Sequence, residues 1–181
     1  MPAFKMPSRA SVLKNIKVNF DHTAKIAAAL KEVSTTRVMA GVPAEKGLRD
    51  PEDSGEKASG INNAALMYIH EFGAPEANIP PRPVVYPAIR SIQKEVIAGL
   101  KAIGKFALAG QVEMVDKGFH ALGILAQNAM RKRITDGPFE PLSPRTIAAR
   151  RARGRTGTKP LIDTGQLRRA LTYVIRKVKW F

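Results

Sequence analysis

The stretch from Pro87 to Asp136 constrains the fold of this chain more than any other part of its sequence. Apolar residues recur there at the three- and four-residue spacing of an amphipathic helix, and Pro87 suits a first helical turn. Several glycines interrupt the pattern and favour a break near Gly110. We therefore expect either two packed helices or one kinked helix. The predicted apolar positions are Ile89, Ile92, Val96, Ile97, Leu100 and Ile103, then Val112, Val115, Phe119, Leu122, Leu125, Ala126 and Ile134.

Two short strands are predicted on either side of this helical part. Residues 37–42 alternate until Pro43 ends the pattern, and residues 171–178 alternate in the same way. Strands so far apart, with helices between them, predict an α+β fold in which a small antiparallel sheet packs against long α-helices. A chain of 181 residues is enough for one such domain, which we assign to residues 21–181.

Four shorter helices are predicted from the residues that would cap them. Asp21, Asn62, Ser143 and Thr164 each precede a short segment and can accept a hydrogen bond from its first turn. Pro144 would stand at the first position of the third of these helices. The apolar positions of the first helix are Ile26, Ala27, Leu30 and Val33.

Two segments are predicted to lack a packed core of their own. Residues 1–20 carry four basic residues without a sustained period, which indicates an extended basic arm that orders only against a partner. They also lack the apolar run of a secretory signal or a membrane span, so we expect a cytoplasmic site of synthesis. Residues 44–60 hold five acids and three bases among glycines and a proline, which predicts a mobile surface loop. Calcium binding there is disfavoured, because Ile61 stands where a bidentate glutamate is needed.

A stiff connector precedes the long helical stretch and consists of Pro80, Pro81, Arg82 and Pro83. The fixed φ angles of its prolines favour an extended backbone. We expect this connector to set the angle between the small sheet and the long helices.

Positive charge is concentrated near the two ends of the sequence. The net charge is +15, and residues 131–181 hold fourteen bases against three acids. Neighbouring like charges on a short helix cost roughly a few tenths of a kcal/mol each, so we expect a facing anion, either DNA phosphate or an acidic surface of another subunit. A merely solvated face is the remaining alternative. The candidate residues for a subunit interface or a DNA-facing surface are Arg145, Arg150, Arg151, Arg153, Arg155, Lys159, Arg168 and Arg169.

The sequence offers little for catalysis. Cysteine is absent, which excludes thiolate nucleophiles, disulfides and the common zinc sites. His70 beside Glu71 is the best candidate for a general base, but adjacent residues do not share a helix face, and a structural histidine is the better interpretation. No nucleotide-binding, hydrolase or zinc-protease motif occurs. We therefore predict no catalytic residue, no cofactor, no metal and no enzymatic activity.

Two stretches of the sequence carry a resemblance to known families. Residues 68–73 (YIHEFG), with 79–83 (IPPRP) and 87–89 (PAI), resemble a signature of phage tail-completion and neck proteins. Residues 141–148 (PLSPRTIA), with 159–167 (KPLIDTGQL), resemble a stretch of phage virion-morphogenesis proteins. The chain departs from the first pattern at Val84 and Val85, where an aromatic residue or leucine is usual. It also stops two residues beyond Lys179, so that a following strand is missing or supplied by a neighbour.

The resemblance implies a structural virion protein at the head-tail junction. Such a protein forms a homo-oligomeric ring, with six or twelve copies expected, that joins or stabilises the tail end and surrounds the DNA path. Its implied partners are head-completion or adaptor proteins, tail-terminator or tail-tube proteins, and packaged double-stranded DNA contacted without sequence preference. It would be assembled in the host cytoplasm, function in the virion and contact no membrane. The alternative is a basic nucleic-acid-binding protein that acts without a ring and without sequence preference.

Overall fold

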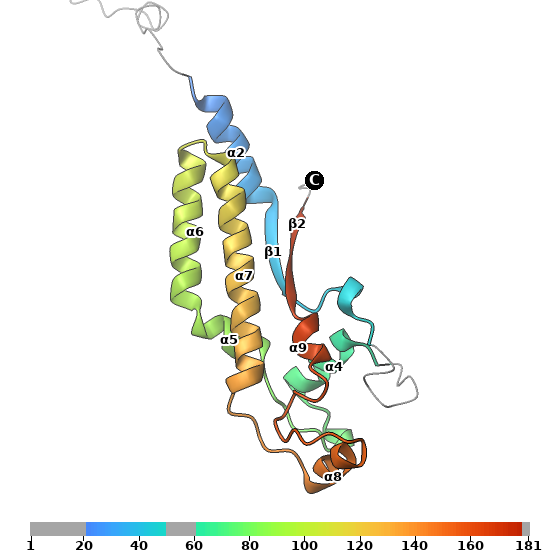
Figure 1. Cartoon of the computed structure of the whole chain (residues 1–181). Coiled ribbons are helices and arrows are strands. Elements are labelled where there is room, and N and C mark those ends of the chain that lie inside the picture. Colours follow the sequence, from blue (N-terminus) through green and yellow to red (C-terminus); the bar gives the residue numbers. More distant parts are fainter. Residues whose placement is uncertain (1–20, 50–60, 179–181) are drawn as a thin grey trace, which may run out of the picture.

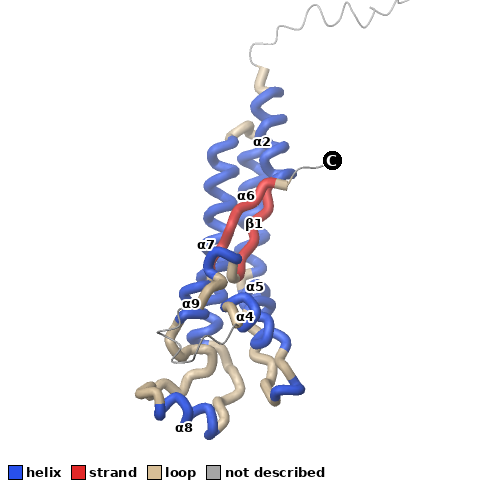
Figure 2. The backbone as a smooth tube through the Cα atoms, turned by 90° about the vertical axis from the view of Figure 1, so that its right-hand side faces the viewer, coloured by secondary structure: helices blue, strands red, loops and turns tan. Residues whose placement is uncertain are grey.

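The computed structural model describes residues 21–49 and 61–178. Within these ranges seven α-helices and a two-stranded antiparallel sheet form the predicted α+β fold (Figure 1). The molecule is elongated, with its long helices side by side and its shorter helices gathered at one end (Figures 1 and 2). We call the end that holds α4, α8 and α9 the lower end. The predicted arm, residues 1–20, and most of the predicted loop, residues 50–60, lie outside the described residues.

The predicted short elements are present, in the predicted order. Residues 44–46 of the predicted loop form one turn of 3-10 helix instead of an irregular segment. The elements in chain order are α2 (Thr23–Thr35), β1 (Thr36–Gly41), the 3-10 helix η1 (Ala44–Lys46), α4 (Asn63–Phe72), the 3-10 helix η2 (Pro75–Ala77), α5 (Val85–Ser91), α6 (Gln93–Leu108), α7 (Val112–Asp136), α8 (Pro144–Ala152), α9 (Gln166–Ala170) and β2 (Thr172–Lys177).

Two of the four predicted caps are confirmed: Asn62 and Ser143 are the N-cap residues of α4 and α8, and their side chains accept from the N–H groups of Ala65 and Thr146. Asp21 and Thr164 each lie one residue before the N-cap, which is His22 in α2 and Gly165 in α9, and they accept from the N–H groups of Thr23 and Gln166. The distances are 2.7 Å for Asn62, 2.9 Å for Asp21, 3.2 Å for Ser143 and 3.3 Å for Thr164. Each bond satisfies a donor that the helix itself leaves without a partner. Local sequence therefore determines where these helices begin.

The long helical stretch breaks twice. The predicted break at Gly110 is confirmed, with a φ of 71° that favours glycine. A second break at Ile92 separates α5 from α6 and was not predicted. The Ser91 hydroxyl donates to the carbonyl of Ala88 at 2.7 Å, which is the carbonyl that the Ile92 N–H would use in a continuous helix. The Ile92 N–H bonds to Ile89 instead, so a side chain competes with the backbone ladder.

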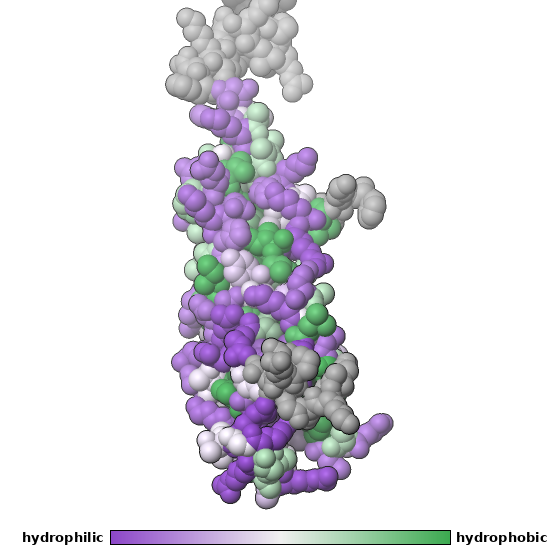
Figure 3. All heavy atoms as spheres, turned by 45° about the vertical axis from the view of Figure 1, so that its right-hand side comes forward, coloured by the Kyte–Doolittle hydropathy of each residue, from purple (hydrophilic) through white to green (hydrophobic). Residues whose placement is uncertain are grey.

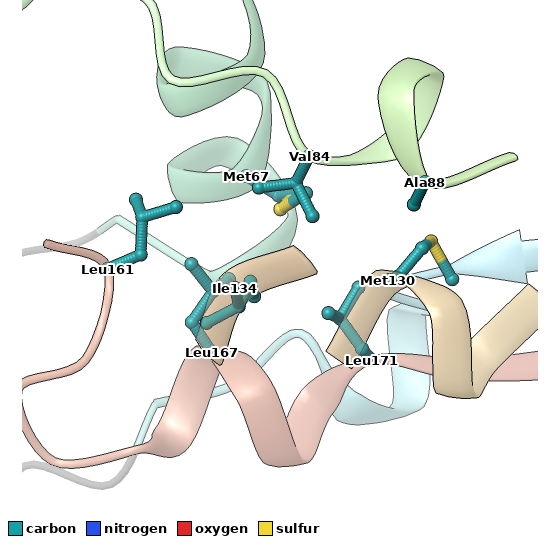
Figure 4. Packing of buried hydrophobic residues seen from close by; sticks show 8 residues of the cluster. All are labelled: Met67, Val84, Ala88, Met130, Ile134, Leu161, Leu167 and Leu171. Carbon is teal, nitrogen blue, oxygen red and sulfur yellow. The ribbon is translucent and has the colours of Figure 1, made fainter. Parts of the chain in front are cut away.

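Two apolar cores follow one another along α7. The upper core joins α2, α6 and α7, and the hairpin of β1 and β2 packs against it through Val38 and Ile175. The lower core joins α4, α5, α9 and the C-terminal half of α7 (Figure 4). The buried residues of the upper core are Ala29, Ile103, Ala107, Val115 and Phe119. Those of the lower core are Met67, Val84, Ala88, Met130, Ile134, Leu161, Leu167 and Leu171.

The hairpin is placed by its neighbours in the chain and by α7. β1 pairs with β2 from Thr36 opposite Lys177 to Gly41 opposite Thr172, and β1 follows α2 without a linker. A Cβ on Gly123 of α7 would clash with the ring of Tyr173, so glycine is what lets the strand approach the helix. The connector at residues 80–83 joins η2 to α5. That it sets the angle between the sheet and the long helices stays a prediction.

The buried side of α6 differs from the predicted stripe. Ile103 is 2% exposed, but Ile97 is 45% and Leu100 50% exposed. Glycines determine this orientation, because a Cβ on Gly99 would lie 2.6 Å from Leu122 of α7 and one on Gly118 would lie 2.5 Å from Ile103. The close helix contact turns Gly99 and Ile103 of α6 inward and leaves Ile97 and Leu100 outside. In α2, likewise, Ala29 is buried and Leu30 is 45% exposed.

Candidate functional site

The turn between α8 and α9 is organised by the buried Arg150, which is 6% exposed. Its Nη1 donates to the carbonyls of Gly157, Lys159 and Ile162 at 3.0, 3.0 and 2.9 Å, and its Nε lies 3.5 Å from Oδ1 of Asp163. Burial lowers the pKa of Arg150 from its ordinary value, and the Asp163 carboxylate opposes this shift. One of the predicted interface cations is therefore buried inside the fold, where it binds backbone carbonyls.

Asp163 supplies part of the anion that the basic run was expected to face. Its Oδ2 lies 2.6 Å from Nη1 of Arg155 and 4.0 Å from Nη2 of Arg153. For Arg150 and Arg155 the chain provides a carboxylate of its own from the KPLIDTGQL stretch, and an external anion stays a prediction. A charge count alone misses this, since the acid lies eight residues beyond the nearer of the two arginines.

The other predicted cations are exposed on α8 and α9 and beside them (Figure 3 shows hydrophilic side chains projecting from the lower end). Lys159 Nζ lies 3.4 Å from the carbonyl of Thr135, and Arg169 donates to the carbonyl of Thr164 at 3.3 Å. The structure thus brings the predicted residues to one end of the molecule but divides them between internal contacts and solvent. The exposed residues are Arg145, Arg151, Arg153, Lys159, Arg168 and Arg169.

Glu71 has a structural role that the sequence did not suggest. Its Oε2 accepts hydrogen bonds from the N–H groups of Val84 and Val85 at 2.7 and 2.9 Å, and its Oε1 accepts one from Tyr86 at 3.1 Å. A carboxylate is favoured at a helix N-terminus by the helix dipole and by the free N–H groups there. Glu71 therefore caps α5 across thirteen residues of chain and does not orient His70.

Hydrogen bonds of Arg82 join the connector to α4 and to the segment before α8. Arg82 is 8% exposed and its side chain donates to the carbonyls of Glu140 and Pro141 at 3.3 and 3.5 Å. Its backbone N–H donates to the carbonyl of His70 at 2.6 Å. Gly73 has a φ of 80°, and a Cβ there would lie 3.0 Å from the Ile79 carbonyl. The first signature stretch therefore encodes the junction of α4, the connector and α5.

A cavity of about 300 Å³ lies between α4, the connector, α8 and α9. His70 lines it with Arg49, Arg82 and Arg150. Burial, followed by the charges of Arg82 and Arg49, lowers the pKa of His70 to about 4. The imidazole is therefore neutral near pH 7 and is too weak a base for proton abstraction there.

An apolar face runs along α4, α5 and α6. A groove of about 570 Å³ between α4 and α5 continues into one of about 360 Å³ along α6, and Tyr86 and Ile89 line both. The rings of Tyr68 and Phe72 lie 4.8 Å apart beside the first groove. The exposed side chains of this apolar face are Tyr68, Phe72, Tyr86, Ile89, Ile97, Leu100 and Leu108.

The described residues offer no metal site, because no three His, Asp or Glu side chains among them lie close enough to hold an ion. The acids of the disfavoured calcium loop, Asp50 to Glu56, lie outside that part of the chain. No helix in residues 21–49 or 61–178 is both long and apolar enough to cross a membrane.

Comparison with known proteins gives no match. No protein-family model matches the chain, and neither a curated protein nor a solved structure is significantly similar to it. The proposals below therefore depend on the residues and their geometry.

Proposed function

We propose that this protein is a structural virion subunit at the head-tail junction of a phage, where its copies form a ring that joins or stabilises the tail end and surrounds the DNA path. The two stretches that resemble tail-completion and virion-morphogenesis proteins support the assignment. They meet at the lower end, where His70 and Arg82 of the first and Thr146 and Asp163 of the second line one cavity. The observation that carries the ring is the apolar face along α4, α5 and α6.

This face is larger than the scattered apolar residues of an ordinary surface. Tyr68, Phe72 and Tyr86 are 66%, 65% and 67% exposed, and Leu108 at the far end of α6 is 65% exposed. The α5 and α6 part covers about twenty residues of helix, or roughly 30 Å. Contiguous apolar surface of this extent is typical of a protein contact. The ring model assigns it to a subunit interface.

Charge favours a second copy of the chain as the occupant. Lys94, Lys101 and Lys105 are exposed beside Ile97 and Leu108 on the outer side of α6. The outer side of α7 presents the exposed acids Glu113 and Asp116. Ile124, which is 47% exposed, follows them at helical spacing, and Lys117 and the His120 partner of Asp116 lie on the same side. A basic apolar surface can therefore meet a more acidic one.

Because these two surfaces differ, the contact is head-to-tail, and such contacts close into rings when the rotation between copies allows it.

The hairpin adds a second surface. Each strand of a two-stranded sheet has a single neighbour, so alternate N–H and C=O groups of β1 and β2 point away from the ladder and can pair with another strand.

The oligomeric state of the purified chain tests this proposal. Sedimentation velocity and native mass spectrometry should give a closed oligomer for the wild type and a monomer for the variant Ile97→Glu with Leu100→Glu. Leu48→Glu is the matched control, because Leu48 is 86% exposed and lies outside the apolar face. A wild type that stays monomeric at every concentration would contradict the ring.

Charge reversal identifies the partner surface. Changing Lys94, Lys101 and Lys105 to glutamate should weaken assembly. Changing Glu113 and Asp116 to lysine in the same chain should restore it. Loss without restoration would show that α6 meets some other surface.

Nucleic-acid binding without a ring is the second candidate, and the exposed arginines of α8 and α9 favour it. A free DNA binder loses affinity steeply as salt rises, with a slope set by the number of phosphate contacts. The ring model predicts weak DNA binding by the isolated chain. Tight, strongly salt-dependent binding by a monomer would favour the second candidate.

A further inference from the structure

The cavity between α4, the connector, α8 and α9 is a cationic recess. Three segments separated in the chain bring Arg49, His70 and Arg82 to it, and α8 adds Arg150. Ser143 and Thr146, at the N-terminus of α8, line the same space. Helix N-termini favour anions through their free N–H groups and their dipole, but here the arginines dominate the charge.

The described side chains that line this recess include three arginines and one carboxylate. Asp163 is the acid that lines it among the described residues, and its carboxylate already faces Arg150, Arg153 and Arg155. Among the described residues, Arg49 and Arg82 therefore have no carboxylate opposite them in the cavity. Both act on His70, whose imidazole they help to keep neutral.

Two buried nitrogen atoms in the recess are available for hydrogen bonds to a ligand. Arg49 Nε and His70 Nδ1 are buried, and neither has a hydrogen-bond partner among the residues that the structure describes. A buried polar group without a partner costs free energy, and such groups in native proteins call for an explanation. An oxyanion would accept from Arg49 and, with the imidazole proton on Nδ1, from His70.

Two of the arginines that line the recess are held in place by the fold. Arg82 and Arg150 are 8% and 6% exposed, and backbone carbonyls fix both guanidinium groups. Side chains held in this way lose little entropy when a ligand binds. A volume of about 300 Å³ accepts a single charged group with its first waters.

From these observations we infer that this cavity is a binding site for a phosphate-type oxyanion, held by Arg49, His70 and Arg82. Phosphate suits it because cationic and neutral donors approach from several segments, and phosphate offers strong acceptor oxygens to more than two of them. The anion is either free inorganic phosphate or the terminal phosphate of a nucleic-acid strand. The site goes beyond the ring proposal and does not depend on it.

Nuclear magnetic resonance of the full chain tests the site. Titration with inorganic phosphate should shift the His70 imidazole resonances saturably, and calorimetry should give one site per chain. Arg49→Gln and His70→Gln should each weaken binding at least tenfold. Arg151→Gln should leave it unchanged, because Arg151 is exposed and does not line the cavity.

The two sources of phosphate are separated by a second titration. A 5′-phosphorylated dinucleotide that binds more tightly than inorganic phosphate, with the unphosphorylated dinucleotide inactive, would assign the site to a strand end. Tighter binding of inorganic phosphate would assign it to the free ion. Absence of saturable binding to both, or equal weakening by Arg151→Gln and Arg49→Gln, would overturn the site. Circular dichroism of each variant shows whether it is folded.

Discussion

The two ends of this molecule are held together in different ways. In the lower end, charged side chains bind backbone groups: Glu71 caps α5, and Arg82 and Arg150 bind carbonyls. Arg131 adds two bonds to the Leu171 carbonyl at 3.1 and 2.7 Å, and Arg133 bonds to Pro83. In the upper core, helices and hairpin meet through apolar side chains and glycines.

The two ends also place different demands on the sequence. A charged group that satisfies several backbone atoms must have one particular length, shape and charge, so few residues can replace it. An apolar contact accepts other residues of similar volume. Both signature stretches therefore belong to the lower end, while the upper end is marked mainly by helical periodicity.

The largest expected effect is the loss of Arg150. Arg150→Ala removes the donor to the carbonyls of Gly157, Lys159 and Ile162, and it takes away the buried arginine that faces Asp163. We expect the free energy of unfolding to fall by about 3–5 kcal/mol in urea denaturation. Arg151→Ala, an exposed neighbour on α8, should change it by less than about 0.5 kcal/mol. Similar values for the two variants would show that the turn is held in another way.

The pH dependence of stability provides the second prediction. The pKa of His70 is lowered to about 4 in the folded chain from roughly 6.5 when unfolded. Between these values the unfolded chain takes up a proton that the native chain does not, so stability is full above about pH 6.5 and falls as pH decreases. We expect a loss of up to about 3 kcal/mol by pH 4. His70→Gln should remove this part of the slope, and equal slopes in urea titrations of both proteins would refute the role of His70.

The upper end is expected to respond to volume instead of charge. Gly123→Ala forces the Tyr173 ring away from α7 and should cost about 1–3 kcal/mol of unfolding free energy. Gly104→Ala on α6 is the matched control, because a Cβ there meets nothing within 4 Å. It should stabilise the chain by up to about 1 kcal/mol through helix propensity. Thermal melts of both variants check the two signs, and equal signs would contradict the packing described for Gly123.

The smallest effect is expected for Glu71→Gln. The amide keeps one acceptor oxygen but loses the charge at the N-terminus of α5, so we expect a loss of about 1 kcal/mol in urea denaturation. Glu76→Gln in η2 is a suitable control, because that exposed acid caps no α-helix. No difference between the two variants would argue against a charged cap.

Sequence periodicity and capping residues were sufficient for most of the fold. The caps at Asn62 and Ser143 and the break at Gly110 were predictable because each depends on local geometry. The break at Ile92 was not, since it arises from a side-chain bond of Ser91. The burial of α6 was mispredicted because glycines on two helices determine which side faces inward.

The candidate site was less predictable. Counting charges located the basic lower end but did not separate the buried Arg150 from the exposed Arg151 beside it. The roles of Glu71 and Asp163 depend on contacts between segments that sequence spacing does not reveal. Both acids lie in the stretches that resemble phage proteins, and neither has a catalytic partner nearby in the sequence. That combination is the signal that suggests a structural role.

The most direct test of the central claim is the location and copy number of this protein in purified phage particles. Mass spectrometry of separated heads and tails, followed by symmetry-resolved imaging of the neck, measures both. The ring account predicts a multiple of six copies at the head-tail junction. Absence from particles, together with recovery of the protein on DNA in infected cells, would contradict it.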